Sequence, residues 1–124
     1  MKVLFVANVD FALRHFVLPL MRAARERGHE VVGACAEGPL LDAPRAEGFR
    51  IVGLPMARSL SPRANWRALR ALRALIRAEK PDLVHGHFPI SGLLARLAAK
   101  LEGVPRIAYT CLLYTSDAAD DTPC

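Results

Sequence analysis

Two short polar segments hold the residues whose types and spacing could do chemistry. The first segment, directly after the apolar run 2–8, contains Asn8 and Asp10 and is followed by Arg14 and His15. Amide and carboxylate groups exchange hydrogen bonds with sugar hydroxyls, and the two basic side chains can bind phosphate. An equally good interpretation is that Asn8 and Asp10 only cap and turn the chain. The segment lacks the Gly-x-Gly-x-x-Gly pattern of dinucleotide sites, which argues against a dehydrogenase.

The second segment is His85-Gly86-His87, at the end of another apolar run. We expect the two imidazoles to point to opposite sides of the chain and therefore not to chelate a metal as a pair. No cysteine or carboxylate stands at ligand spacing to help them, so no metal site is predicted. His87 is the better candidate for contacting a sugar hydroxyl or a phosphate. For His85 a structural hydrogen bond is at least as good an interpretation.

Composition and charge limit the class of protein. Of the 124 residues 52% are hydrophobic and 23% are charged, which is enough apolar material for the core of one domain. The formal net charge of +5 favours partners that carry phosphate. No apolar run has the length of a membrane span or the pattern of a signal peptide, so a cytoplasmic location is expected. Three cysteines at spacings typical of neither metal sites nor disulfide frameworks are expected to be unpaired: Cys35, Cys111 and Cys124.

The elements that must position the two polar segments alternate along the chain. Apolar runs predict strands, and helical spacing of apolar residues predicts helices between them. This alternation predicts an α/β fold, a Rossmann-like doubly wound parallel sheet with helices on both faces. In such a sheet the loops after the first and fourth strands lie side by side, which would bring the polar segments together. The expected strands are 2–8, 30–36, 49–54, 82–85 and 106–110, and the expected helices are 13–27, 39–47, 63–79 and 91–101.

Two of the predicted helices have distinct faces. In the first helix, Phe16, Leu20, Met21 and Ala24 recur at helical spacing and are expected to be buried. In the helix 63–79 all the arginines fall within one arc, and the large apolar residues fall opposite. The arginine face has two interpretations: an ordinary solvated surface, or, because Trp66 projects among the arginines, a surface that binds anionic membrane headgroups. The arginines are Arg63, Arg67, Arg70, Arg73 and Arg77, and the apolar residues are Leu69, Leu72, Leu75 and Ile76.

Residues 111–124 depart from the pattern of the preceding chain. They contain three aspartates and no lysine or arginine. An acidic tail is one interpretation. The letters CLLYTSDAADD, however, resemble the translation of a transposon-end sequencing adapter. We therefore expect a domain over residues 1–110, a native sequence that continues differently after Thr110, and a non-native segment at 111–124.

Several segments resemble one known family, and together they cover residues 1–110. The most specific are RHFVLPL with RGHEV, and KPDLVHGH followed by GVPRIAYT, in this order and at this spacing. They resemble the N-terminal half of a family 4 glycosyltransferase of the GT-B fold. The resemblance implies a retaining, metal-independent enzyme that needs no cofactor and transfers sugar from a nucleotide sugar to a glycan or lipid-linked acceptor in cell-surface glycan synthesis. It also implies a second, nucleotide-binding domain that this chain lacks.

The resemblance assigns the acceptor side of the cleft to this half of the enzyme. Its border would be formed by Asn8, Asp10, Arg14, His15 and His87. The chain departs from the family in two ways, since it has no Gly-Gly pair in its first loop and no histidine turn after Thr110. No catalytic residue is therefore assigned, and the chain alone is expected to be inactive.

Two other functions stay open from the residues alone. One is a free-standing α/β binding module of flavodoxin-like shape. The other is a basic module for nucleic acid, which would need exposed aromatic residues along a groove, whereas the predicted surface offers only Trp66. A nucleic-acid partner is therefore not expected. A peripheral position at the inner face of the membrane is the expected alternative to a purely cytoplasmic one.

Overall fold

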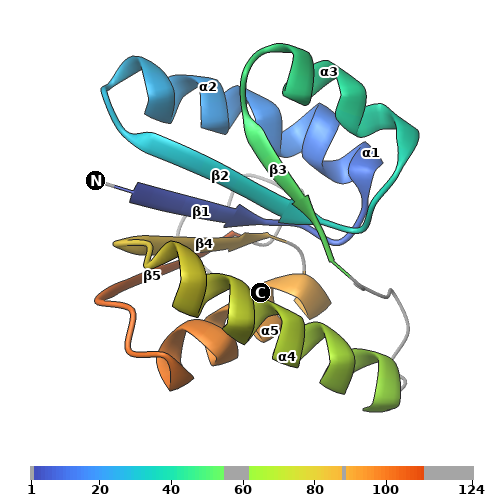
Figure 1. Cartoon of the computed structure of the whole chain (residues 1–124), viewed down its shortest axis with the longest axis vertical. Helices are drawn as coiled ribbons and strands as arrows, with labels where there is room; N and C mark the ends of the chain where they lie inside the picture. Colours follow the sequence, from blue (N-terminus) through green and yellow to red (C-terminus); the bar gives the residue numbers. More distant parts are fainter. Residues whose placement is uncertain (1, 55–61, 88, 111–124) are drawn as a thin grey trace, which may run out of the picture.

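The computed structural model describes residues 2–54, 62–87 and 89–110, and within them five parallel strands form one sheet (Figure 1). The strand order is β3-β2-β1-β4-β5, so the chain winds outward from β1 in both directions. This confirms the predicted doubly wound α/β fold. The segment 111–124 lies outside the described residues. The strands are β1 (Lys2–Val6), β2 (Glu30–Cys35), β3 (Arg50–Gly53), β4 (Leu83–His87) and β5 (Arg106–Thr110).

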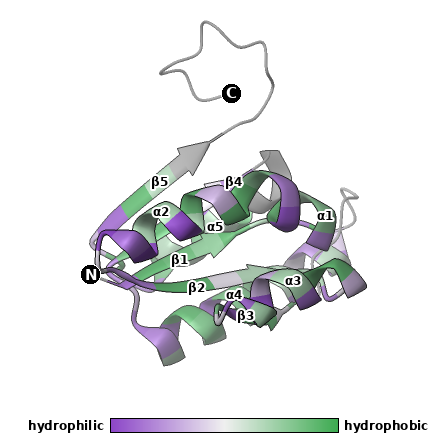
Figure 2. Ribbon diagram, turned by 90° about the horizontal axis from the view of Figure 1, so that it is seen from above, coloured by the Kyte–Doolittle hydropathy of each residue, from purple (hydrophilic) through white to green (hydrophobic). Residues whose placement is uncertain are grey.

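Helices cover both faces of the sheet, as crossovers between parallel strands require. Figure 1 shows the helices that follow β1 and β2 on one face and α4 and α5 on the other. In Figure 2 the central strands β1 and β2 are in hydrophobic colours between helices of mixed colour. The first layer contains α1 (Asp10–Ala12), η1 (Leu13–Val17), α2 (Leu18–Glu26), η2 (Pro39–Leu41) and α3 (Asp42–Ala46). The second contains α4 (Pro62–Glu79) and α5 (Pro89–Leu101).

The sheet separates two hydrophobic cores. Alternate residues of a strand point to opposite faces, so Val3 and Phe5 join the core under α2, while Leu4 and Val6 join the core under α4. The predicted apolar face of the long helix is confirmed, because its four large residues are buried in the second core: Leu69, Leu72, Leu75 and Ile76.

The prediction for the first helix was wrong about its start and about Phe16 and Leu20, whereas Met21 is buried and Ala24 packs against the same core. The helix begins at Asp10 and contains a wide π-type turn, in which the N–H of Leu18 donates to the carbonyl of Leu13, five residues earlier. This turn shifts the residues that follow it around the helix axis. Phe16 and Leu20 therefore face outward, half exposed, and the residues buried on the sheet are Leu13, Val17, Leu18 and Met21.

Ion pairs fasten the ends of the elements at the amino edge of the sheet. Glu79, at the end of α4, is buried, and its carboxylate binds Lys2 Nζ at 2.8 Å and Arg50 Nη2 at 2.6 Å. Burying a carboxylate is unfavourable unless it is paired, and these two cations satisfy it. The ion pairs join α4 to β1 and β3.

Strand β4 approaches helix α5 so closely that only glycine fits between its two histidines. A Cβ placed on Gly86 would lie 2.9 Å from Gly92 Cα and 3.1 Å from Ala95 Cβ. The first of these atoms belongs to backbone, which cannot move aside as a side chain can. The position of His87 therefore depends on a backbone contact between β4 and α5.

We predict that Gly86→Ala lowers the free energy of unfolding by about 1–3 kcal/mol, the usual range for overpacking. Chemical denaturation measures this difference. Gly53→Ala is the control, because the atoms nearest to a Cβ there belong to the exposed side chain of Glu37 and not to backbone. Moving that side chain costs at most its surface ion pair with Arg45, so the variant should lose less than about 1 kcal/mol. Equal losses in the two variants would contradict the close approach of β4 to α5.

Candidate functional site

The carboxyl ends of β1 and β4 lie side by side at the point where the winding of the sheet reverses. Val6 pairs with Gly86, so the residues that follow each strand meet at one edge. The Asn8 carbonyl accepts a hydrogen bond from the N–H of Ala36, which keeps the chain after β1 alongside β2. This placement confirms that the two polar segments flank the topological switch point, where α/β proteins bind their ligands.

Asn8 is half-buried, and its side chain is only partly used by the fold. Asn8 Oδ1 accepts the N–H of Val9 at 2.9 Å. A primary amide also has an NH₂ group with two donors. The oxygen therefore helps to turn the chain and does not cap a helix, and the amide nitrogen has the chemistry to donate to a hydroxyl.

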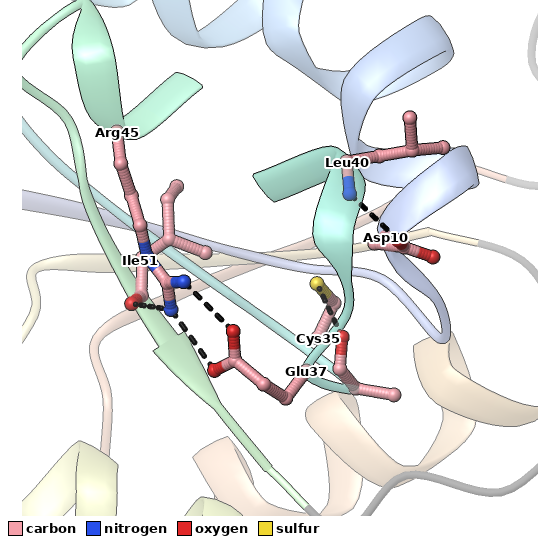
Figure 3. A network of polar contacts seen from close by, with 7 residues as sticks. Asp10, Cys35, Glu37, Leu40, Arg45 and Ile51 are labelled. Atoms are coloured by element: carbon pink, nitrogen blue, oxygen red, sulfur yellow. Dashed lines mark hydrogen bonds and ion pairs between the residues drawn. The ribbon is translucent and has the colours of Figure 1, made fainter. Parts of the chain in front are cut away.

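The Asp10 carboxylate holds two backbone segments together (Figure 3). Its Oδ1 accepts the N–H of Phe11 at 2.9 Å, and its Oδ2 accepts the N–H of Leu40 at 3.0 Å. Gly38 packs against the same carboxylate so closely that a Cβ there would overlap Asp10 Oδ2. Asp10 thus fixes the segment after β2 against the start of α1, which is a contact between distant segments rather than a helix cap.

An ion pair continues this network on the far side of β2 (Figure 3). Arg45 donates to both carboxylate oxygens of Glu37, at 2.7 and 3.0 Å, and to the carbonyl of Ile51 at 3.0 Å. The Arg45 guanidinium lowers the pKa of Glu37. Burial, with a smaller contribution from the charge of Asp10, raises the pKa of the Cys35 thiol to about 12. Cys35 is therefore a thiol rather than a thiolate at neutral pH, and it lacks the reactivity of a nucleophile.

Arg14 and His15 lie in the wide turn of the first helix but do different things. Arg14 is half-buried. Hydrogen bonding by Arg22 lowers the pKa of Glu47, and the positive charge of Arg14 makes a smaller contribution in the same direction. His15 is exposed, and its ring centre lies 4.4 Å from that of Phe11. The structure therefore places His15 on the outer surface of η1 with an aromatic neighbour.

His85 and His87 lie on the same face of β4, and the prediction that they point to opposite sides was wrong. Their ring centres are 4.1 Å apart, and the ring of Phe5 lies 6.0 Å from that of His87 in a stacked arrangement. The strand continues through His87 instead of ending at His85, and residues two apart in a strand share a face. Within the described ranges, no three residues of the His, Cys, Asp and Glu types gather as a metal site would require.

The two imidazoles are held in the neutral form. His87 is 1% exposed, and burial, reinforced by the neighbouring His85, lowers its pKa to about 3. Burial also lowers the pKa of His85. A neutral imidazole offers one donor and one acceptor to a hydroxyl group, but it carries no charge for a phosphate. The neutral state of the ring therefore favours the hydroxyl over the phosphate as a ligand for His87.

The carboxylate of Glu102 pairs with two of the arginines on the arginine face of α4. Arg73 Nε donates to Glu102 at 2.8 Å, and Arg77 donates to it at 3.1 and 2.8 Å. Hydrogen bonds from Arg77 and Arg73 lower the pKa of Glu102 to about 2. The part of the face near the start of α4, with Arg63, Trp66, Arg67 and Arg70, is exposed. In the part of the chain that the structure describes, no helix is long and apolar enough to cross a bilayer.

A family of known proteins matches almost the whole chain. The model of the family described as "Glycosyl transferase 4-like" matches residues 2–118. The chain belongs to this family. The Bacillus subtilis (strain 168) protein EpsD, named as a glycosyltransferase, is 38% identical over 119 residues, which are 93% of this chain and 28% of that protein.

A second relative is named for the reaction that it catalyses. It is the UDP-Gal:alpha-D-GlcNAc-diphosphoundecaprenol alpha-1,3-galactosyltransferase of Escherichia coli, 37% identical over 78 residues, or 61% of this chain and 20% of that protein. The chain thus spans less than a third of the length of the curated relatives it matches.

Solved structures of glycosyltransferases and epimerases share the fold. A UDP-N-acetylglucosamine 2-epimerase superposes with a TM-score of 0.71 at 18% identity, over 88% of this chain and 31% of that chain. Identity this low establishes the fold alone. The described residues therefore form one Rossmann-like half of a GT-B arrangement, as the sequence resemblance implied.

We predict that protonation of His87 destabilises the fold in acid. Between the pKa of 6.5 in the unfolded chain and about 3 in the folded chain, only the unfolded chain binds this proton. The stability is therefore complete above pH 6.5 and falls as the pH decreases towards 3. From pH 7.5 to 5.0 this one group should remove about 2 kcal/mol from the free energy of unfolding.

Denaturant titrations of the unmodified chain and of His87→Gln at the two pH values test this. Glutamine keeps a donor and an acceptor but does not titrate, so the variant should show a smaller loss of stability in acid. An identical pH dependence in both chains would mean that His87 is not held neutral by burial.

Proposed function

We propose that this chain is the acceptor-binding half of a retaining glycosyltransferase that transfers sugar from a nucleotide sugar to a lipid-linked or polysaccharide acceptor in cell-surface glycan synthesis. The observation that carries the proposal is the family match, together with the polar groups at the edge where β1 and β4 end. A relative named for transfer to a diphosphoundecaprenol-linked sugar supports a lipid-linked acceptor. The longer protein would supply the nucleotide-binding domain, and the reaction would take place on the cytoplasmic side of the membrane.

The roles of the site residues follow from their surroundings. The Asn8 amide nitrogen and the neutral imidazole of His87 would bind acceptor hydroxyls, because both are uncharged donors at the switch point. Asp10 would position the loop that carries them, since both of its carboxylate oxygens already accept backbone N–H groups. His15 and Arg14 would lie at the border of the acceptor site. Residues 1–110 would form the functional domain, and 111–124 would contribute nothing to it.

In the longer protein that contains this chain, Asn8→Ala and His87→Phe, which keeps a ring but has no hydrogen-bonding group, should each raise the KM for the acceptor about fivefold to tenfold. That is the usual effect of one lost hydrogen bond to a neutral hydroxyl. The KM for the nucleotide sugar should not change, because the donor would bind to the other domain. Steady-state transfer of labelled sugar, with each substrate varied in turn, measures both constants.

Arg27→Gln is the control for this experiment, because Arg27 is exposed at the end of α2, away from the carboxyl edge. It should leave both constants unchanged. A higher KM for the nucleotide sugar in the Asn8 or His87 variant would contradict the assignment of this half to the acceptor. Hydrolysis of nucleotide sugar by the present chain alone would contradict it as well.

A second proposed property concerns the exposed start of α4. Arg63, Arg67 and Arg70 are exposed there beside Trp66, and aromatic and basic side chains together suit the headgroup region of an anionic membrane. Arg73 and Arg77 contribute less, because Glu102 compensates their charge. Such a surface would hold the enzyme near a lipid-linked acceptor.

Replacing Arg63, Arg67 and Arg70 by glutamine should weaken binding to anionic vesicles about a hundredfold at low salt, since each charge near the surface contributes about 1 kcal/mol. The effect should fade as salt is added. Vesicle co-sedimentation measures it. A triple variant that loses the same charge elsewhere on the surface, at Arg27, Lys80 and Lys100, is the control and should bind almost normally. Equal weakening in the two variants would mean that vesicle binding depends on net charge alone, and it would contradict a specific membrane surface at the start of α4.

A further inference from the structure

A stripe of large apolar side chains runs along the outer surface of the first helix. Phe11 is 52% exposed, Phe16 is 50% exposed and Leu20 is 41% exposed. The rings of Phe11 and Phe16 meet edge to face, with centres 6.3 Å apart. We call Phe11, Phe16 and Leu20 the apolar stripe. The apolar stripe does not pack on the sheet, because the helix uses other residues for that contact.

The wide turn at Leu13–Val17 is what aligns this stripe. In a regular α-helix, residues five apart lie about 140° apart around the axis, so Phe11 and Phe16 would not share a face. A turn closed by a bond to the fifth preceding residue brings such residues together. Leu20 follows Phe16 by four residues, the spacing of neighbours on one helix face. Wide turns of this kind are frequent at functional sites.

The stripe begins beside the polar residues of the candidate site. Phe11 directly follows Asp10, and its N–H is bound by the Asp10 carboxylate. His15 packs on the ring of Phe11, and Arg14 lies in the same turn. A narrow apolar track that starts at polar and basic groups suits an elongated amphiphile, with its phosphate near the basic residues and its hydrocarbon chain along the stripe.

We propose that the apolar stripe binds the isoprenoid chain of a lipid-linked acceptor. This inference rests on the proposed function. It adds a second contact between the chain and the acceptor, away from the reacting sugar. The aromatic rings offer large, rigid apolar surface, and removing that surface from water stabilises the complex. The arrangement leaves the hydroxyl-binding groups at the switch point for the sugar that accepts the new bond.

Binding of farnesyl phosphate, a short isoprenoid phosphate that dissolves in water, tests this with the chain as it is. The double variant Phe16→Ser with Leu20→Ser should weaken binding about tenfold, equivalent to about 1.4 kcal/mol. Titration calorimetry measures the affinity. The matched control is Leu93→Ser with Leu97→Ser, a pair at the same spacing on α5 with exposures of 59% and 43%, and it should change the affinity less than about twofold.

Several results would overturn the inference. They are failure of farnesyl phosphate to bind, equal weakening in both double variants, and competition by inorganic phosphate that displaces the ligand completely.

Two other results would assign the stripe to a different occupant. One is binding to neutral phosphatidylcholine vesicles that only the stripe variant loses. The other is a concentration-dependent dimer that only the stripe variant loses. Because the assay uses no nucleotide sugar, it separates this inference from the proposed function. Normal sugar transfer to a lipid-linked acceptor by the longer protein with the stripe variant would contradict the inference alone.

Discussion

β1 and β4 pair in parallel at the centre of the sheet, and this pairing brings the two polar segments of the candidate site to one carboxyl edge. The register sets Val6 against Gly86, so the chain leaves the two strands at the same level and in opposite directions. Both faces of these strands must be covered, because they carry apolar side chains on each side. The two cores and the two helical layers follow from that requirement. Asn8 and His87 lie at the same edge of the sheet because Asn8 follows β1, His87 ends β4, and the register of the two strands is fixed.

Close packing around β4 then determines the chemistry of its histidines. The missing side chain at Gly86 lets the strand lie against α5, which excludes water from one side. Phe5 and the paired imidazoles exclude it from the other side. With so little water near it, the imidazolium form of His87 is strongly disfavoured, and the ring is neutral at physiological pH.

The charged residues of the surface divide into those that hold elements together and those left for solvent or a partner. Arg22 and Arg25 both contact Glu47, and Arg25 also lies over the ring of Phe49 at 3.9 Å, which fastens α2 to the segment around α3. Glu102 connects α4 to the end of α5 through Arg73 and Arg77. A count of arginines on a helical wheel treats all of them alike. Among the described residues, Arg73 and Arg77 form ion pairs with Glu102, whereas Arg63, Arg67 and Arg70 in the first half of α4 form none.

The sequence by itself determined the fold class, the order of the elements and the apolar face of α4, because hydrophobic periodicity and helix-ending residues are local signals. It also located both polar segments, since strand ends can be read from short apolar runs. The tertiary structure decided what those residues do. A helical wheel with a constant angle per residue placed Phe16 and Leu20 in the core, and the wide turn at Leu13–Val17 moved them to the surface. The structure also extended β4 through His87 and brought the two imidazoles together. The role of Asp10 depends on Leu40, thirty residues away, and the neutral state of His87 depends on burial by several elements. Interactions between distant segments leave no periodic pattern in the chain, so only the folded structure reveals them.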